Sequence, residues 1–222
     1  TTSDGWCPFA IKKLVPSHKF WRGNQGRAAV VMHVSQGTMQ SMINWFLGGS
    51  EATAHFGIGL DGKLYQFVSV QDSAFGNGAS MRNGRWYDPR GNLIQPPWAG
   101  LRPNVNPNWY TISVEHAGFW RDSWTPEMDA TNTRLLIWLA EQFPGLAPYV
   151  PGQTLIGHCD ISPIDRKNCP GPTVDYARIA AAASQGAGAP TGQFMTQESS
   201  IIDQPRASAA QAAHYIISPF AR

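Results

Sequence analysis

Two histidines and one cysteine in this chain have the side chains needed to bind a metal ion. His33 ends a short apolar run that starts at Val30, whereas His158 and Cys169 lie far downstream, in a segment rich in proline and glycine. Two imidazoles and a thiolate are a sufficient ligand set for a zinc ion that keeps one coordination position open. An open position is typical of catalytic zinc sites. The three residues are therefore candidate ligands of a catalytic Zn2+.

Spacing alone is a weak argument for this site. His158 precedes Cys169 by eleven positions, which is neither a zinc-finger spacing nor the helical His-Glu-x-x-His pattern. A single histidine is more often structural than catalytic, and Cys169 by itself would be read as a buried thiol. Cys7 and Cys159 remain outside the ligand set. They either form a disulfide in an oxidising compartment or both stay free.

Composition excludes several functional classes. The chain has 222 residues, a formal net charge of +2 and only 14% charged residues, whereas a nucleic-acid-binding protein normally carries a basic stripe. No run of about eighteen apolar residues is present, so we expect no insertion into a membrane. The length is sufficient for one well-packed domain and a tail. We expect a monomer.

The elements that must position the candidate ligands follow from periodicity and turn residues. An Asp61-Gly62 pair between two extended runs predicts a hairpin, and Thr125-Pro126-Glu127 is typical of a helix start. No regular structure is expected around His158 and Cys169. The expected strands cover residues 28–34, 55–60, 63–68 and 111–116, and the expected helices cover residues 38–47, 125–143 and 173–183.

This order of elements predicts an α/β fold, with a mixed central β-sheet flanked by helices in a single catalytic domain. Residues 76–109 are rich in Gly, Asn, Pro and Arg, and we expect them to form a long loop that makes one wall of a substrate groove. The predicted domain covers residues 1–183. Residues 184–222 are expected to be a Gly/Ala/Pro linker and a C-terminal tail, which could begin a truncated second module.

Several blocks of the chain resemble successive motifs of one enzyme family, the zinc-dependent N-acetylmuramoyl-L-alanine amidases of type 2. This family includes phage endolysins and is related to the peptidoglycan recognition proteins. The resemblance covers residues 28 to 180, and its most specific part is the closing Lys-x-Cys-Pro-Gly-Pro motif. The matching blocks are Val31–Ser35, Ala54–Gln66, Thr111–His116, Gly157–Ile161 and Lys167–Pro172.

The resemblance implies roles for five residues. It places the zinc ligands at His33, His158 and Cys169, the general base at Glu115 and a catalytic lysine at Lys167. The reaction that it implies is hydrolysis of the amide between N-acetylmuramic acid and L-alanine of peptidoglycan by a zinc-activated water. Such an enzyme acts on the bacterial cell wall, either as a secreted protein or after release from a phage-infected cell.

The chain departs from the family at two positions. The tyrosine that some members carry at the hairpin start is replaced by Ala54, which leaves Glu115 as the candidate base. The aromatic-His-Ala-Gly block that usually follows the hairpin corresponds to Asp72–Asn77, which contains no histidine.

The chemistry of amide hydrolysis agrees with these assignments. Zinc lowers the pKa of a bound water to about 7 and polarises a carbonyl. A carboxylate such as Glu115 can take the proton of the water and return it to the leaving amine. An ammonium such as Lys167 can stabilise the developing oxyanion. Without the resemblance, Glu115 would be read as part of a salt bridge and Lys167 as a solvated charge.

Two other functions compete with the zinc amidase. The first is a peptidoglycan-binding module without catalysis, which the presence of all three candidate ligands disfavours. The second is a cysteine hydrolase with Cys169 as nucleophile and His158 as base. The Cys-Pro-Gly-Pro setting disfavours it, because a catalytic cysteine gains from a helix N-terminus that lowers its pKa.

Overall fold

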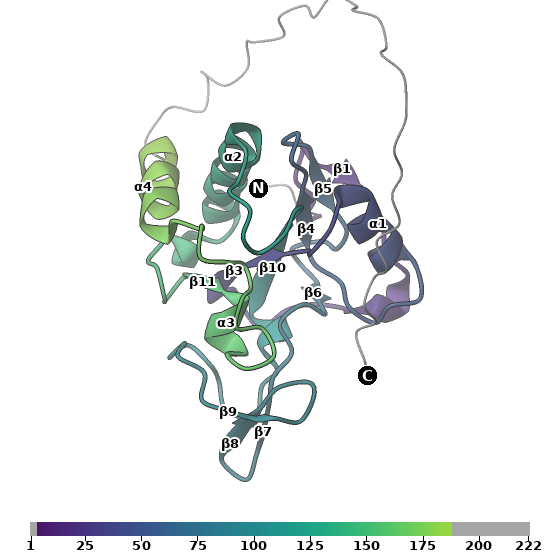
Figure 1. The fold of residues 1–222 in the computed structure, drawn as a ribbon, viewed down its shortest axis with the longest axis vertical. Helices are drawn as coiled ribbons and strands as arrows, with labels where there is room; N and C mark the ends of the chain where they lie inside the picture. Colours follow the sequence, from purple (N-terminus) through teal and green to yellow (C-terminus); the bar gives the residue numbers. More distant parts are fainter. Residues whose placement is uncertain (1–3, 188–222) are drawn as a thin grey trace, which may run out of the picture. The chain divides into compact units, whose positions relative to one another are not determined.

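The computed structural model describes residues 4–187, which are built around a six-stranded sheet. Strands β3, β4, β10 and β11 run parallel to one another, and β5 pairs antiparallel with β4. The sheet is therefore mixed, as the sequence predicts (Figure 1). Its spatial order is β1 (Ile11–Lys12), β5 (Leu64–Gln66), β4 (Phe56–Ile58), β10 (Thr111–His116), β3 (Ala29–Val34) and β11 (Leu155–Gly157).

Helices α2 (Pro126–Gln142) and α4 (Tyr176–Ala187) lie side by side over one face of this sheet (Figure 1). The Thr125 side chain caps α2 by accepting a hydrogen bond from the Met128 N–H at 3.1 Å, which confirms the predicted helix start. The core between the sheet and the two helices is formed by Val30, Met32, Ile112, Val114, Leu135, Leu136, Leu139, Ile179 and Ala183.

The opposite face of the sheet is covered partly by α1 (Met39–Leu47), capped by Thr38. Helix α1 buries Met42, Ile43 and Phe46 and follows the predicted bounds. It approaches the sheet closely at Gly57, where a Cβ atom would come within 2.6 Å of the Met42 sulfur. A two-stranded ribbon lies outside the main sheet and consists of β2 (Phe20–Trp21) and β6 (Ser73–Ala74).

The register of the central strands decides which residues meet. Glu115 on β10 pairs directly with His33 on β3, and directly paired residues of parallel strands point to the same face of a sheet. Gly157, the last residue of β11, pairs with Met32. His158, the next residue, therefore lies at the edge of the sheet where β3 and β10 end, close to His33 and Glu115.

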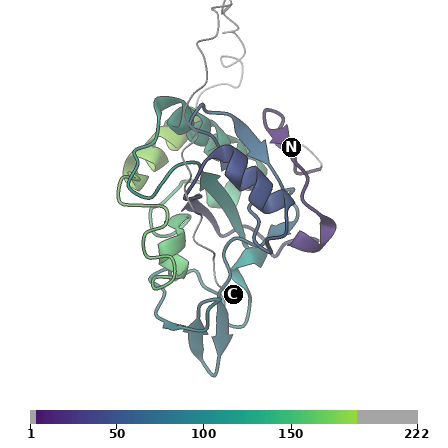
Figure 2. The same ribbon diagram turned by 45° about the vertical axis from the view of Figure 1, so that its right-hand side comes forward.

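Residues 76–109 are not the long loop that the sequence suggested. They contain the antiparallel strands β7 (Ser80–Arg82), β8 (Arg85–Tyr87) and β9 (Leu93–Ile94) and the 3-10 helix η2 (Pro107–Trp109), and the small sheet projects from the main body (Figure 2). The β7–β8 turn is Asn83-Gly84, both with positive φ, a combination typical of a tight hairpin. Trp98 and Ile94 bury this segment against Val31 and Ile156 of the main sheet.

Two other predictions of local structure need correction. His158 is not in an irregular segment, because it begins α3 (His158–Ile161). Helix α4 begins at Tyr176 rather than at Thr173. The Thr173 hydroxyl instead donates to the Asp122 carbonyl at 2.7 Å, and the Asp175 carboxylate accepts the Arg178 N–H in the manner of a helix cap.

The predicted linker and tail, residues 184–222, lie mostly outside the described residues. The first four of these residues, 184–187, are described and continue α4. The division of the chain into 1–183 and 184–222 stays a prediction. No helix between residues 4 and 187 combines the length and the apolar character required to cross a bilayer.

Candidate metal centre

The three predicted ligands lie together at the C-terminal edge of the parallel strands. His33 is on β3, His158 begins α3, and Cys169 follows in the loop between α3 and α4. One candidate ligand atom from each residue lies within 4.8 Å of the others. The distance between His33 Nδ1 and Cys169 Sγ is 3.9 Å. The centroids of the His33 and His158 rings are 4.4 Å apart. Among the described residues, only this group has the donors and the proximity to hold a metal ion.

Hydrogen bonds fix which nitrogen of His33 is free to bind a metal. The Thr111 hydroxyl donates to the Pro107 carbonyl at 2.7 Å and so accepts the Asn77 amide N–H, also at 2.7 Å. The carbonyl oxygen of Asn77 therefore faces His33, 2.8 Å from Nε2. This assigns the proton of the neutral imidazole to Nε2 and leaves the lone pair of Nδ1 directed toward Cys169.

Replacing Asn77 by alanine should weaken zinc binding about 10- to 100-fold, because residues that orient a metal-ligating histidine contribute on that scale. The dissociation constant would be measured by competition with a chromophoric chelator. Asn44→Ala, at an exposed position on α1, is the matched control and should bind zinc like the unmodified protein. Equal affinity in the two variants would contradict the orienting role of Asn77.

Burial keeps both histidines neutral. It lowers the pKa of His33 to about 3 and places the pKa of His158 well below its ordinary value. A neutral imidazole offers a lone pair to a metal, whereas a protonated one does not. Both rings are therefore in the state that metal binding requires.

Two hydrogen bonds to the backbone, one from β3 and one within its own loop, hold Cys169 in place. Its Sγ accepts the Val34 N–H at 3.4 Å, and its backbone N–H donates to the Arg166 carbonyl at 2.9 Å. Burial raises the pKa of the Cys169 thiol, so a thiolate at this position requires a nearby cation such as a metal ion. The same burial disfavours Cys169 as the activated nucleophile of a cysteine hydrolase.

Glu115 lies beside the cluster. Its Oε1 atom is 3.8 Å from His33 Nδ1, whereas Oε2 is buried and accepts no hydrogen bond from the described residues. Burial raises the pKa of Glu115 to about 7, and the positive charge of Arg166 opposes this rise. A carboxyl group with a pKa near neutrality is suited to accept and return a proton.

These features fit a zinc ion. Tetrahedral zinc with a nitrogen ligand at about 2.0 Å and a sulfur ligand at about 2.3 Å places the two donors about 3.5 Å apart, close to the distance between His33 Nδ1 and Cys169 Sγ. The donor set is two neutral imidazoles and one thiol, and the unpartnered oxygen of Glu115 lies next to it.

Lys167 is placed differently from the ligands. It lies in the loop before Cys169, but its side chain is exposed. The neighbouring Arg166 is the cation whose charge acts on His33, Glu115, His158 and Cys169. The role that the resemblance gives to Lys167 stays a prediction.

Two further buried histidines have structural roles. His55 accepts the Ser113 N–H at Nδ1, and its Nε2 lies 3.1 Å from the Asp72 carbonyl. His116 stacks on Trp124, and its two nitrogens contact the His33 carbonyl and the Asn132 side chain. Both nitrogens of each ring are thus engaged, so neither ring is free to act as a base. His116 instead connects the backbone of the candidate ligand His33 to α2.

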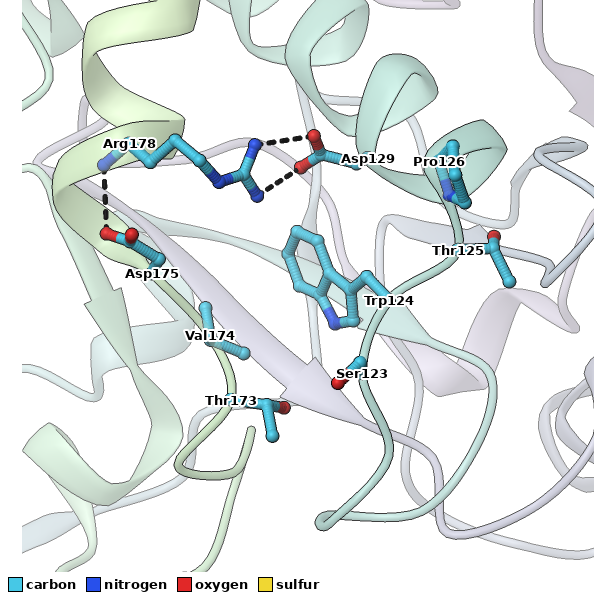
Figure 3. Close-up of a pocket in the computed structure, with 9 residues that line it drawn as sticks. All are labelled: Ser123, Trp124, Thr125, Pro126, Asp129, Thr173, Val174, Asp175 and Arg178. Carbon is cyan, nitrogen blue, oxygen red and sulfur yellow. Dashed lines mark hydrogen bonds and ion pairs between the residues drawn. The ribbon is translucent and has the colours of Figure 1, made fainter.

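Two hollows flank the loop that follows β10. One, of about 320 Å³, is lined by residues that follow His33 and Glu115 in the chain, among them Gly37, Gly118 and Phe119. The other, of about 350 Å³, lies between the starts of α2 and α4. Figure 3 shows Arg178 reaching across it to Asp129, in a bidentate ion pair that joins the two helices.

Sequence reasoning missed Asn77 and Arg166. Asn77 lies in the segment that was already notable for lacking the histidine of the family, and Arg166 is next to Lys167 in the metal loop. Neither side chain could be assigned a role before the tertiary contacts were known. Cys7 is free and buried in the core, and Cys159 is also free.

A family model described as N-acetylmuramoyl-L-alanine amidase matches residues 22–172. No curated protein matches the chain.

Three solved structures share the fold at low sequence identity. A selenomethionine derivative of AmpD has 21% identity and a TM-score of 0.60, over 81% of this chain and 97% of that one. AmpD of Citrobacter freundii has 19% identity and a TM-score of 0.52, over 88% and 100%. AmpDh3 of Pseudomonas aeruginosa, in complex with an anhydromuramic pentapeptide, has 20% identity and a TM-score of 0.53, over 72% and 60%.

Proposed function

Because the chain belongs to the N-acetylmuramoyl-L-alanine amidase family, we propose that it hydrolyses the bond between N-acetylmuramic acid and L-alanine with a zinc ion held by His33, His158 and Cys169. One observation carries this proposal. The three ligand atoms converge within 4.8 Å, and the Glu115 carboxylate lies 3.8 Å from His33 Nδ1. These distances support a metal-binding group and a proton-accepting group at one place.

The chain's own residues have separate tasks in this reaction. When bound, zinc would polarise the scissile carbonyl and activate water. Glu115 takes a proton from the attacking water and returns it to the amine of L-alanine as that amine leaves. Asn77 holds the His33 ring in its binding orientation, and Lys167 supplies positive charge at the open side of the loop.

The substrate class is peptidoglycan, on which the family acts. The anhydromuramic pentapeptide bound by one solved relative contains the same kind of muramyl-peptide linkage that we propose as the target. We infer that the protein reaches the cell wall by secretion or by release from a phage-infected cell.

A non-catalytic peptidoglycan-binding module is the weaker alternative. Such a module needs no metal ligands and no buried carboxylate beside them, whereas this chain brings all of these groups together. Catalysis is therefore favoured over binding alone.

The test is a product analysis on a soluble muramyl peptide. Mass spectrometry should detect free muramic acid lactyl carboxylate and a peptide with a new N-terminal L-alanine. A strong chelator should abolish this cleavage, and added zinc should restore it. Tight peptidoglycan binding without any cleavage by the zinc-loaded protein would favour the binding module instead.

A chain that ends at Ala187 should keep its zinc and its activity on the soluble substrate, because every residue given a role precedes α4. A chain that ends at Val174 is the contrasting variant. It lacks the buried Ile179 and Ala183 of α4 and should fold poorly. Both variants would be assayed on a soluble muramyl peptide and on intact cell walls.

Three outcomes of this truncation are informative. Equal activity of the Ala187 variant on both substrates would make residues 188–222 dispensable. A loss on cell walls alone would make them a targeting segment. A loss on the soluble substrate with zinc still bound would contradict the prediction.

A further inference from the structure

The small sheet turns one face toward the main body and the other toward solvent. Directly paired residues of neighbouring strands point to the same face, and Trp86 pairs with Ile94 on the face that packs in the core with Val31. The alternating residues form the opposite face, which we call the outward face. It consists of Ser80, Arg82, Arg85, Tyr87 and Leu93.

Two like charges lie directly opposite each other on the outward face. Arg82 on β7 pairs with Arg85 on β8, and both arginines are exposed. Neither forms an ion pair with any of residues 4–187. Like charges at directly opposite positions destabilise a pair of strands. Such a departure from the local preference for opposite charges is expected at functional sites.

Two simpler explanations do not account for this pair. Charges on an edge strand discourage pairing with other chains, but Arg85 lies on β8, the middle strand of the small sheet. A neighbouring acid does not neutralise the pair either, because Asp88 is the only acidic residue between positions 76 and 109. The Asp88 carboxylate accepts hydrogen bonds from the Arg90 N–H and from the backbone and side-chain N–H groups of Asn92. The positive charge of the outward face is therefore available to a ligand.

The outward face also offers apolar area beside its charges. The Arg82 guanidinium lies 5.7 Å from the centroid of the Tyr87 ring, a cation–π contact that restricts the guanidinium. Leu93 pairs with Tyr87 and is 49% exposed. Arginine binds a carboxylate through two parallel hydrogen bonds, so this face suits a ligand that has carboxylates next to apolar groups.

The small sheet is connected to the segment that carries two of the candidate metal ligands. Arg90, in the turn between β8 and β9, forms an ion pair with the buried Asp165, with 2.8 Å between Arg90 Nε and Asp165 Oδ1. The Trp98 N–H donates to the Asp160 carbonyl at 3.1 Å, two residues after His158. The outward face and the metal centre thus belong to connected segments, and a polymeric ligand is long enough to contact both.

We propose that the outward face is a docking surface for polymeric peptidoglycan, on which Arg82 and Arg85 bind carboxylates of stem peptides other than the one being cleaved. This inference rests on the proposed function and goes beyond it, because it assigns a second contact to the same substrate. Charge complementarity supports this ligand, since stem peptides repeat along a glycan strand and carry free carboxylates. Two linked contacts raise the apparent affinity for a polymer above that of either contact alone.

The experiment measures binding of the zinc-loaded full chain to sacculi from which phosphate-containing polymers have been stripped with hydrofluoric acid. The reference protein and all variants carry Glu115→Gln, so that the sacculi stay intact. Adding Arg82→Gln and Arg85→Gln together should raise the dissociation constant roughly 3- to 30-fold, the range for the loss of two exposed ion pairs. The difference should shrink at high salt, and Arg82→Lys with Arg85→Lys should recover part of the affinity.

Two controls accompany this measurement. Lys12→Gln with Lys13→Gln removes the same charge from two exposed positions at the β1 edge of the main sheet and should leave the dissociation constant unchanged. On sacculi whose carboxyl groups have been converted to amides, the double glutamine variant of Arg82 and Arg85 should bind as well as the reference protein.

Thermal stability separates docking from structural damage. Removing one of two opposed positive charges lowers their repulsion, so Arg85→Gln should melt at the same temperature as the reference protein at low salt, or at a higher one. Its binding to sacculi should nevertheless weaken. A purely structural role of Arg85 predicts a lower melting temperature together with the weaker binding.

Several results would overturn the inference. They include an unchanged dissociation constant for the double variant of Arg82 and Arg85, an equal loss in the lysine control, and a lower melting temperature of Arg85→Gln. A loss that persists on amidated sacculi would exclude carboxylates as the ligand. A loss seen only on walls that keep their phosphate polymers would assign the outward face to those polymers. The proposed function fails separately, if the unmodified zinc-loaded protein leaves soluble muramyl peptides intact.

Discussion

Replacing Cys169 by serine should remove most of the bound zinc and with it the amidase activity. A serine hydroxyl stays protonated near neutral pH and is a poor zinc ligand, whereas a thiolate is a strong one. The site would retain only His33 and His158. Elemental analysis of protein purified without chelator should show near-stoichiometric zinc in the unmodified chain and a small fraction of that in the variant.

Cys159→Ser is the matched control for this experiment. Cys159 is free, partly buried and in the same segment, and its backbone N–H donates to the Cys169 carbonyl. It lies outside the candidate ligand set, so the control should keep its zinc. Full zinc retention by Cys169→Ser would show that the assignment of this ligand is wrong.

Replacing Glu115 by glutamine should leave the fold and the zinc in place and lower kcat about 10²- to 10⁴-fold, the range for a general acid–base group. Glutamine has nearly the volume of glutamate but cannot accept and return the proton. The measurement combines kcat on a soluble muramyl peptide with the zinc content of the same preparation. Glu141→Gln, on the exposed side of α2, is the control and should remain fully active.

Stability gives a second readout for Glu115. Burial raises its pKa from the ordinary 4.5 to about 7, so the folded metal-free protein is destabilised as the pH rises from the lower to the higher of these values. Metal-free Glu115→Gln should therefore melt at a higher temperature than the unmodified protein at pH 8, and the difference should shrink toward pH 4.5. Near-normal turnover by this variant would remove Glu115 from the mechanism.

The sequence predicted the central strands and two helices well, because their local signals agree with their tertiary environment. The strand Thr111–His116 and the helix after Thr38 have the predicted bounds. Thr125 and Pro126 mark the start of α2 in both the sequence and the structure. Each of these elements carries apolar residues that are buried in the core, so pattern and packing favour the same conformation.

The errors arose where burial depends on distant partners. The small sheet of residues 80–94 has short strands with many polar residues, so periodicity could not separate it from a loop. The Asn83-Gly84 turn was its available signal. Thr173 was a plausible helix cap from its residue type, but its hydroxyl bonds the Asp122 carbonyl, fifty-one positions away.

The sequence likewise predicted some residues of the candidate site and missed others. His33, His158 and Cys169 were found from residue type and resemblance, and the structure brings their ligand atoms together. Asn77 contacts Thr111 as well as the candidate ligand His33, and Arg166 forms an ion pair with Asp165. Such supporting contacts depend on chain segments that pair only in the folded state, so no local pattern could have predicted them.

The parallel register of β3, β10 and β11 also constrains how the protein folds. Glu115 pairs with His33 eighty-two positions away, and the last strand, which precedes His158, joins β3 from still further along the chain. Contacts at such sequence separation form slowly and late. A nascent chain therefore cannot assemble the three-ligand site before most of the domain has been synthesised. During unfolding, loss of β11 from the edge of the sheet should release the ion, which makes the rate of zinc release a measure of the protein's kinetic stability.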